Sequence, residues 1–351
     1  MSAAARIVVT GGAGFIGAGV VRQLVEGGHD VSVLDSLRPD VHRDGGAAAR
    51  QRLGALAVTL TQADVRDLDA VLAAVRGADA VVHLAAKVGL GVDLADMDDY
   101  VSSNDLGTAV VLRAAGAARA ARFVQASSMV VYGEGRYTCA EHGVVPPAPR
   151  RLDSLQDRQF EPPCPECGRA LEAGLVDESA PLDPRNTYAV TKVAQEHLAA
   201  VWARETGGAA VSLRLHNVYG PGMPRNTPYA GVAAIFSSSL DRGEAPTVFE
   251  DGCQRRDFVH VDDIGAAFRA SVEAATVGHI ALNVGSGVVS TVGDMARALA
   301  GARGGPDPVV TGGFRLGDVR HITASSARIA SELGWRARVP LAEGVRGLTF
   351  T

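Results

Sequence analysis

The first half of the chain alternates short, almost continuous apolar segments with longer segments in which apolar residues recur at helical spacing. Such apolar strands, separated by helices, are typical of a parallel sheet that helices cover on both faces. We expect strands at residues 6–10, 30–35, 57–62, 80–84 and 122–126, and helices at 15–26, 68–75 and 97–119. Right-handed crossovers between these strands give an α/β fold of the Rossmann type, with a doubly wound parallel sheet.

The alternation stops at residues 134–183, which are rich in Pro, Arg and Cys and show no clear period. This stretch is too long for an ordinary loop, so we interpret it as an insertion with its own local organisation. A helix at 188–206 and a strand at 210–215 resume the pattern, and the later elements are shorter and more varied. We therefore expect a Rossmann domain at 1–216 and a smaller α/β substrate-binding lobe at 217–351, with 257–275 returning to the Rossmann domain.

The composition is that of a globular α/β protein, with 47% hydrophobic and 21% charged residues among 351. A net charge of −5 and the lack of a long basic run argue against nucleic acid as a partner. No apolar stretch approaches the length of a membrane span, and the chain leads from Met1 into an apolar strand without room for a signal peptide. We therefore expect a cytoplasmic protein in which the four cysteines stay reduced.

A glycine-rich turn, TGGAGFIG at 10–17, follows the first expected strand and places glycines at Gly11, Gly14 and Gly17. Glycines at this spacing permit a sharp turn, let a pyrophosphate approach the backbone, and let the next helix pack closely on the sheet. The helix begins near Phe15 and Ile16, where free N–H groups favour phosphates. The turn predicts a dinucleotide site, and the alternative is a plain strand-to-helix turn.

An acidic residue, Asp35, ends the second expected strand about 20 residues after the loop. An acidic side chain there accepts hydrogen bonds from the ribose hydroxyls and repels a 2′-phosphate, which favours NAD over NADP. The nearby Arg38 keeps NADP open as the alternative. Further residues at the carboxyl ends of strands, where ligands of open α/β sheets bind, are Asp64, Val65, Leu84, Ala85, Ala86 and Lys87.

Only two of the 34 basic residues are lysines, Lys87 and Lys192. Arg is wide and stays charged, whereas Lys is compact and exchanges protons, so a retained Lys suggests a position where Arg cannot serve. Lys192 lies four residues after Tyr188, and the fifth expected strand leads into Ser127 and Ser128 at the cofactor edge of the sheet. Taken singly, the Tyr–Lys pair could arise by chance, and the serines could only cap the strand end.

Taken together, these residues resemble the extended short-chain dehydrogenase/reductase superfamily, specifically its nucleotide-sugar epimerases and dehydratases. The resemblance covers nearly the whole chain, in ordered motifs: GGAGFIG at 11–17, HLAA at 83–86, SMVVYG at 128–133, YAVTK at 188–192, RLHNVYGPG at 214–222, QRRDFV at 254–259, NVGSG at 283–287 and RLGD at 315–318. It implies NAD as cofactor, a nucleotide-diphosphate sugar as substrate, and a homodimer formed through the helices at 97–119 and 188–206. The cofactor-binding residues that we predict are Gly11, Gly14, Phe15, Ile16, Gly17, Asp35, Asp64, Val65, Leu84, Ala85, Ala86, Lys87, Asn104, Tyr188 and Lys192.

The resemblance also implies the catalytic roles. Tyr188 removes a proton from a sugar hydroxyl while a hydride passes from the same carbon to NAD, and Ser128 hydrogen-bonds the reacting oxygen. A tyrosine with a pKa of about 10 is a poor base at neutral pH. A nearby ammonium, such as that of Lys192, and the nicotinamide cation would stabilise the phenolate and lower that pKa. Lys192 would also hold the nicotinamide ribose.

The residues after Ser128 discriminate between reactions. Met129 and Val130 stand where 4,6-dehydratases carry Asp-Glu, and neither transfers protons, so dehydration is not expected. Epimerisation at C4 through a transient 4-keto intermediate fits best. The alternatives are a 4-ketoreductase, which needs stoichiometric reduced cofactor, and a non-catalytic NAD-binding regulator, which the serine, tyrosine and lysine together argue against. A 6-deoxyhexose carried on dTDP follows from similarity alone.

Substrate-binding residues follow from the same resemblance. Arg256 and Arg315 match the family's diphosphate arginines, and Asn217 matches its amide contact to the diphosphate; bidentate hydrogen bonds make Arg suited to phosphate. The alternative for either arginine is a surface side chain. His216 departs from the aromatic residue common before that Asn, and we expect it to be structural or to contact the sugar.

The insertion contains two pairs of metal-ligand residues, CAEH at 139–142 and CPECG at 164–168. The spacing of Cys139, His142, Cys164 and Cys167 matches a tetrahedral Zn²⁺ site, and a bound metal would stabilise a segment with few apolar residues. Reduced thiols without metal are the alternative. Four protein ligands close the coordination shell, so the site is expected to be structural. Because the insertion emerges beside the active site, a lid or substrate-shaping role is a further hypothesis.

Overall fold

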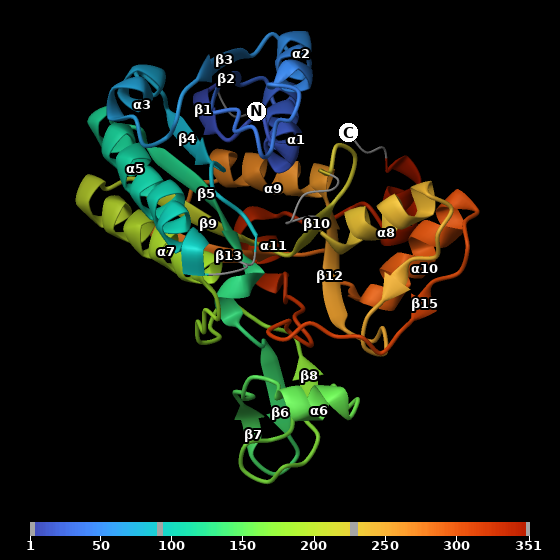
Figure 1. Ribbon diagram of the computed structural model, residues 1–351. Helices are drawn as coiled ribbons and strands as arrows, with labels where there is room; N and C mark the ends of the chain where they lie inside the picture. Colours follow the sequence, from blue (N-terminus) through green and yellow to red (C-terminus); the bar gives the residue numbers. More distant parts are fainter. Residues whose placement is uncertain (1–3, 90–93, 225–230, 349–351) are drawn as a thin grey trace.

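The centre of the molecule is a seven-stranded sheet in the order β13-β9-β5-β4-β1-β2-β3, in which each neighbouring pair is parallel (Figure 1). The structure is a computed structural model that describes residues 4–89, 94–224 and 231–348. The strands are β1 Arg6–Thr10, β2 Asp30–Asp35, β3 Thr59–Gln62, β4 Ala80–His83, β5 Arg122–Ser128, β9 Ala209–Leu215 and β13 His279–Val284. The strand order reverses between β1 and β4, the kind of place where ligands bind in open α/β sheets. The predicted doubly wound α/β fold is confirmed.

Helices cover both faces of this sheet (Figure 1). On one face, α1 and α9 pack side by side, and buried residues such as Leu24 and Phe268 share one apolar core with the strands. On the other face, α3, α5 and α7 form a second core that includes Val111 and Trp202. The helices that surround the central sheet are α1 Phe15–Glu26, α2 Ala47–Ala55, α3 Leu68–Ala74, α5 Gly107–Ala117, α7 Thr187–Thr206, α9 Val261–Glu273 and α11 Ala327–Leu333.

The strand expected at 122–126 continues to Ser128, and two further elements differ in ways that the backbone explains. The strand expected at 57–62 begins at Thr59, because Ala57 has a positive φ of 54° in the turn that ends α2. The helix expected at 97–119 is three segments: α4 Met97–Tyr100, a π-helical stretch Val101–Leu106, and α5. The chain leaves α5 through Arg119, which has a φ of 57°. In each case a non-glycine residue adopts the left-handed conformation that sequence patterns assign to glycine.

The second lobe surrounds a small sheet in the order β10-β12-β14. Its core contains Phe236, Phe258 and Leu299, contributed by α8, β12 and α10. After β12 the chain passes directly into α9, on the Rossmann sheet. The elements of this lobe are β10 Asn217–Tyr219, α8 Val232–Asp241, β11 Thr247–Val248, β12 Arg255–His260, β14 Val289–Thr291, α10 Val292–Arg303, β15 Val309–Val310, α12 Leu341–Gly344 and the 3₁₀ turn Val345–Gly347.

The insertion projects from the body of the molecule, at the bottom of Figure 1. It is a three-stranded antiparallel sheet in the order β7-β6-β8, with one short helix. Its small core holds Tyr137, Cys139, Cys164 and Leu171. The elements are β6 Arg136–Cys139, β7 Gly143–Val145, α6 Leu152–Gln156 and β8 Glu172–Gly174.

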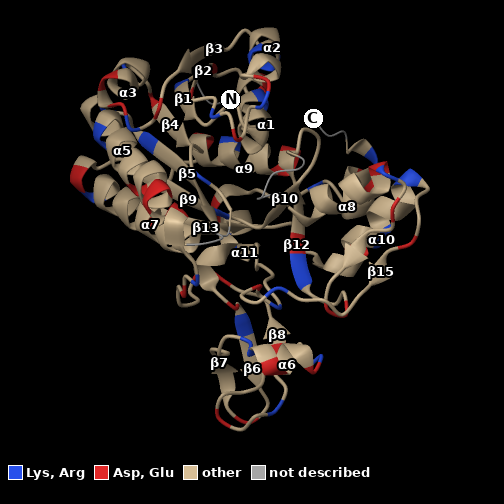
Figure 2. Ribbon diagram, in the orientation of Figure 1, with Lys and Arg blue, Asp and Glu red and all other residues tan. Residues whose placement is uncertain are grey.

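Charged residues of both signs are interspersed over all three parts (Figure 2). A basic stretch, Arg255 and Arg256, opens β12 on the side that meets the insertion, where Arg255 donates to the carbonyl of Ala173. Among the described residues, no helix combines the length and the apolar character that a membrane crossing requires.

Candidate active site

The glycine-rich loop joins β1 to α1 at the edge of the sheet. Gly11 has a φ of 71°, and a Cβ there would lie 2.6 Å from the backbone N of Ala85. A Cβ on Gly17 would overlap the carbonyl of Gly11. Gly14 is different, because its φ of −72° is ordinary and its Cβ would meet only Gly11 O, at 3.5 Å.

Gly14 is also the residue before the first turn of α1, and no side chain caps that turn. Neither the backbone conformation nor a steric contact therefore requires glycine at this position, whereas a pyrophosphate lying against the helix N-terminus does. The loop fits a dinucleotide on this observation alone.

Asp35 ends β2 beside the loop and is 9% exposed. Its carboxylate accepts hydrogen bonds from the backbone N–H groups of Ala13 (3.0 Å) and Leu37 (2.9 Å). These bonds fix the carboxylate while each oxygen keeps a second lone pair for a ribose hydroxyl. Arg38, whose position in the sequence left NADP as an alternative cofactor, donates hydrogen bonds from its guanidinium to the carboxylates of Asp40 and Asp99.

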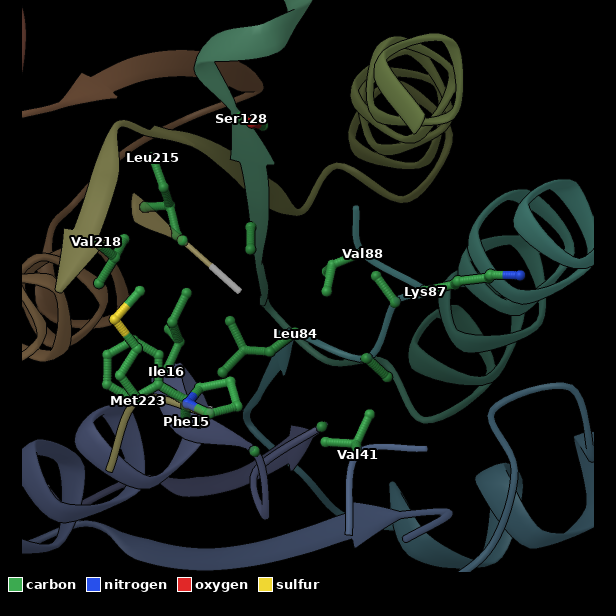
Figure 3. A pocket seen from close by; sticks show the side chains of 18 of the residues that line it. Phe15, Ile16, Val41, Leu84, Lys87, Val88, Ser128, Leu215, Val218 and Met223 are labelled. Atoms are coloured by element: carbon green, nitrogen blue, oxygen red, sulfur yellow. The ribbon is translucent and has the colours of Figure 1, made fainter. Parts of the chain in front are cut away.

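A cavity of about 480 Å³ lies above the loop, between the Rossmann sheet and the second lobe (Figure 3). It is lined by every predicted cofactor residue except Asn104, and by Ser128 and Asn217 of the predicted substrate residues. Phe15 and Ile16 enter it from α1, Leu84 from the end of β4, and Ser128 from the end of β5 (Figure 3). The structure thus brings the cofactor loop and the predicted catalytic residues to one cavity.

Tyr188 and Lys192 lie one turn apart on α7, whose N-cap Asn186 accepts from the backbone N–H of Ala189 at 2.8 Å. Lys192 is 3% exposed, lies 5.6 Å from the Tyr188 ring centre, and donates to the carbonyl of Ala126 at 2.8 Å. Burial lowers the pKa of Lys192 to about 8. Burial raises the pKa of Tyr188 to about 12, while a hydrogen bond with Ser128 acts in the opposite direction.

A buried ionic network lies beneath this site. Ser127 donates to Glu196 at 2.5 Å, so its hydroxyl is turned to the protein rather than to a ligand. Arg214 makes two bonds to the same Glu196 carboxylate, at 2.9 and 2.7 Å, and a third to the hydroxyl of Tyr132. Charges this deeply buried are stable only when paired, so the network fixes the end of β5 and thereby the position of Ser128.

Two residues predicted to contact the cofactor have other partners. The ammonium of Lys87 points away from the cavity (Figure 3) and pairs with Asp96 at 2.9 Å and Asp99 at 2.8 Å. Burial alone would lower the pKa of Lys87, but these carboxylates raise it above its usual value. The Asn104 amide is fully buried and bonds the backbone N and O of Lys87 and the hydroxyl of Thr191. Asn104 therefore orders the loop that lines the cavity and does not line it itself.

The predicted diphosphate arginines also lie outside the cavity. Arg256 donates to the carbonyls of Arg255, Val319 and Arg320, at 2.7 to 2.9 Å. Arg315 is exposed and lies 5.4 Å from the Phe249 ring centre.

Two polar residues of the cavity lining have unsatisfied buried atoms. Among the described residues, both ring nitrogens of His216 and the Oδ1 of Asn217 are buried without a hydrogen-bond partner. Burial, followed by the charge of Arg256, lowers the pKa of His216 to about 3, so the imidazole is neutral. Since buried polar atoms are normally paired, this part of the lining is suited to a polar ligand.

Several residues of the site were missed from the sequence. Val41 and Met223 line the cavity (Figure 3) but belong to no motif. The position of Met223 directly after the Gly220-Pro221-Gly222 turn could have indicated it. Glu196 was missed as well, although it lies one helical turn beyond Lys192 on α7.

A second cluster lies in the insertion, where Cys139, His142, Cys164 and Cys167 place their ligand atoms within 4.8 Å of one another. Cys139 Sγ lies 3.5 Å from His142 Nδ1 and 3.7 Å from Cys167 Sγ. The backbone N–H of Glu141 and the His142 ring lower the pKa of Cys139 to about 6, which favours the thiolate that binds metals. The four residues fit a tetrahedral site with thiolate and imidazole ligands.

The Rossmann sheet, the dinucleotide loop and the Ser–Tyr–Lys set at one cavity define the class: this is an extended short-chain dehydrogenase/reductase. The sequence profile of the NAD dependent epimerase/dehydratase family matches residues 7–152 and 166–285. The chain belongs to this family.

Relatives share almost the full length of the chain. The dTDP-L-rhamnose 4-epimerase of Burkholderia thailandensis is 32% identical over 97% of this chain and 93% of its own. The UDP-glucose 4-epimerase of Mycolicibacterium smegmatis is 32% identical over 97% of this chain and 96% of its own. Among solved structures, a Thermus thermophilus UDP-glucose 4-epimerase in complex with NAD has a TM-score of 0.75 and 30% identity, and covers 97% of both chains.

Proposed function

We propose that this chain epimerises a nucleotide-diphosphate sugar at C4, with NAD as a bound cofactor that undergoes no net change. The observation that carries the proposal is the meeting of Ser128, Tyr188 and Lys192 with the dinucleotide loop at one cavity. The absence of proton-transferring side chains at Met129 and Val130 favours epimerisation over dehydration. The named activities of the relatives from Burkholderia and Mycolicibacterium support C4 as the reacting carbon.

In this mechanism NAD, when bound, is the hydride acceptor and donor. Ser128 hydrogen-bonds the sugar O4, and Tyr188 takes the O4 proton and later returns it. Burial raises the pKa of Tyr188 despite its hydrogen bond with Ser128, so the lowering expected from the sequence would come from the cationic nicotinamide. Lys192 holds the nicotinamide ribose, and the neutral His216 and Asn217 contact the sugar or its diphosphate.

The test is incubation of the purified protein with nucleotide sugars, without added cofactor, followed by NMR. A dTDP-6-deoxyhexose is the first substrate to try. Inversion at C4 is expected, and a deuterium placed at C4 should remain there, because the hydride returns to the carbon that it left. Tyr188→Phe should bind NAD and lose turnover. Conversion only when NADPH is supplied would establish the 4-ketoreductase instead, and binding without turnover would favour a regulator.

We propose that the insertion binds one Zn²⁺ through Cys139, His142, Cys164 and Cys167, supported by their closeness. Metal analysis should find one zinc per chain. Cys164→Ser should lose it, whereas Cys253→Ser, which changes an exposed cysteine outside the cluster, should retain it. Equal zinc contents in the two variants would refute the site.

We propose a homodimer through α4, α5 and α7. The support is a set of exposed apolar residues on these neighbouring segments: Met97, Val101, Leu106, Val190 and Val201. Sedimentation should show a dimer, and Val190→Asp should shift it to monomer; a monomeric unmodified chain would contradict this. A cytoplasmic location, a Rossmann domain at 1–216 to which 257–275 returns, and a substrate-binding lobe in the remainder of 217–351 complete the proposal.

A further inference from the structure

Among the contacts between the insertion and the second lobe, those to residues 315–321, which run between β15 and α11, are ionic and buried. Arg320 of this segment is 1% exposed and donates to three carboxylates. It bonds Asp251 at 2.8 Å and Glu250 at 2.8 Å, both in the second lobe, and Glu161 of the insertion at 2.7 Å. The other oxygen of Glu161 contacts the ring of His321 at 2.9 Å. One carboxylate of the insertion thus holds two successive residues of the segment.

A second residue of the insertion, Arg150, holds the same segment at its middle. Its side chain is 4% exposed and donates to Glu250 at 2.8 Å and to the carbonyl of Asp318 at 2.6 Å. Arg150 and Arg320 therefore share Glu250, and the insertion and the second lobe are joined through one buried ionic network. Such networks are stable only with their partners in place, which makes the contact specific in geometry.

The held segment in turn positions Arg256. The guanidinium of Arg256 donates to the carbonyls of Val319 at 2.7 Å and Arg320 at 2.9 Å, and Arg256 pairs with Ile322 in a parallel bridge. Arg315 lies at the start of the segment, against Phe249, the neighbour of Glu250 in sequence. Both arginines that match the family's diphosphate ligands thus depend on where residues 315–321 lie.

Glu161 belongs to the part of the insertion that the family profile leaves unmatched, between its two matched ranges 7–152 and 166–285. The profile therefore assigns no family role to Glu161. Burial alone would raise the pKa of Glu161, but His321 and Arg320 lower it to about 2, so the carboxylate is ionised at any assay pH.

We propose that the insertion is a positioning element for the substrate's diphosphate: Glu161 and Arg150 fix residues 315–321 and so set where Arg256 and Arg315 lie, the two arginines that the family resemblance assigns to that group. The inference rests on the proposed function for the assignment of these two arginines. Neither Glu161 nor Arg150 touches the reacting atoms. Their loss should weaken binding of the ground state and the transition state alike, which raises KM and leaves kcat unchanged.

The experiment measures binding of dTDP and UDP by calorimetry, and KM and kcat with a converted nucleotide sugar. Glu161→Gln should weaken nucleoside diphosphate binding and raise KM by about tenfold, the size of one charge-assisted contact, with kcat within about twofold. Arg150→Lys keeps the charge but cannot reach all three acceptors of the guanidinium, and should act in the same direction. Glu161→Asp should recover part of the affinity.

The matched control is Asp153→Asn, which removes a carboxylate from an exposed ion pair with Arg151 in the same insertion. It should change neither Kd nor KM. Zinc content and NAD content, measured on every variant, should match those of the unmodified protein. The unfolding midpoint should fall for Glu161→Gln and Arg150→Lys, which weaken a buried ionic network, and stay unchanged for Asp153→Asn.

The outcomes distinguish the positioning role of the insertion from the assignment of the diphosphate arginines. If Glu161→Gln binds the nucleotides as Asp153→Asn does, or lowers kcat at constant KM, the positioning role is overturned. If the unmodified protein binds no nucleoside diphosphate, or Arg256→Met binds it unchanged, the assignment of the diphosphate arginines falls and the inference falls with it.

Discussion

Gly14→Ala tests whether glycine at this position serves the ligand rather than the fold. The new Cβ would lie 3.5 Å from Gly11 O, an ordinary van der Waals contact, and a φ of −72° suits alanine. Two small effects on stability oppose each other. Reduced freedom of the unfolded chain stabilises by about 0.4–1 kcal/mol, while alanine caps a helix less well than glycine by about the same amount. The unfolding free energy of the cofactor-free protein should therefore stay within about 1 kcal/mol.

Binding of NAD should respond differently, because the methyl group would stand between the pyrophosphate and the first turn of α1. We expect the affinity to fall by at least about tenfold, or about 1.4 kcal/mol. The assays are urea unfolding of cofactor-free protein and calorimetric titration with NAD. In a thermal scan at about 100 times the unmodified Kd, NAD stabilises the unmodified protein by about 2.7 kcal/mol, and Gly14→Ala should lose at least half of this gain.

Gly17→Ala is the matched control. Its Cβ would overlap the carbonyl of Gly11 and lie 2.7 Å from Gly12 Cα, and both are backbone atoms. This variant should be destabilised by about 1–3 kcal/mol or more even without NAD. The reasoning is refuted if Gly14→Ala loses more than about 2 kcal/mol without ligand, or if it binds NAD as the unmodified protein does.

Three further predictions concern the residues around the cavity. Burial lowers the pKa of Lys192 from 10.5 to about 8, so between these pH values the unfolded chain binds more protons than the folded one and stability rises with pH. From pH 8 to 10.5, the cofactor-free protein should gain up to about 3 kcal/mol of stability relative to Lys192→Met. Stability curves from urea unfolding that run parallel for the two proteins would contradict this. Glu196→Gln leaves the Arg214 charge buried with a weaker partner and should cost about 3–5 kcal/mol in denaturant unfolding, whereas adding Arg214→Met should recover part of it. Asn104→Ala frees the backbone of Lys87 and should cost about 1–3 kcal/mol and weaken NAD binding in calorimetry, although Asn104 does not line the cavity; unchanged affinity would show that the loop needs no such support.

The parts of the fold that the sequence predicted are those with a local physical signal. The bounds of β1, α1 and β2 were correct to the residue, because buried parallel strands need continuous apolar side chains and a glycine-rich turn separates them. The errors arose where tertiary contacts override local pattern. The π-helical stretch Val101–Leu106 contains Asn104, whose partners at Lys87 and Thr191 lie far away in sequence.

The site shows the same division. The loop, Ser128, Tyr188 and Lys192 were placed at one cavity because each belongs to a motif on a recognisable strand end or helix. The orientation of an arginine side chain could not be predicted in this way, because it depends on hydrogen-bond acceptors that lie outside the motif. Arg256 bonds the carbonyls of Val319 and Arg320, more than 60 residues further on. Sequence patterns assign residue types to a site, whereas the partners of long side chains decide which of them reach it.

Lys87 and Lys192 show how the partners of a side chain determine its role. Their rarity singled out both, but the structure gives them opposite environments. Lys87 has two carboxylate partners, Asp96 and Asp99, and such a pair is fully explained by the order it gives to its loop. Lys192 is more deeply buried, yet among the described residues no carboxylate pairs with it, and its ammonium donates to the carbonyl of Ala126. A buried ammonium without an ion-pair partner costs stability and has a lowered pKa. This destabilising, unpaired ammonium lies beside Tyr188, and a buried lysine with a perturbed pKa is what we expect of a residue with a role in catalysis.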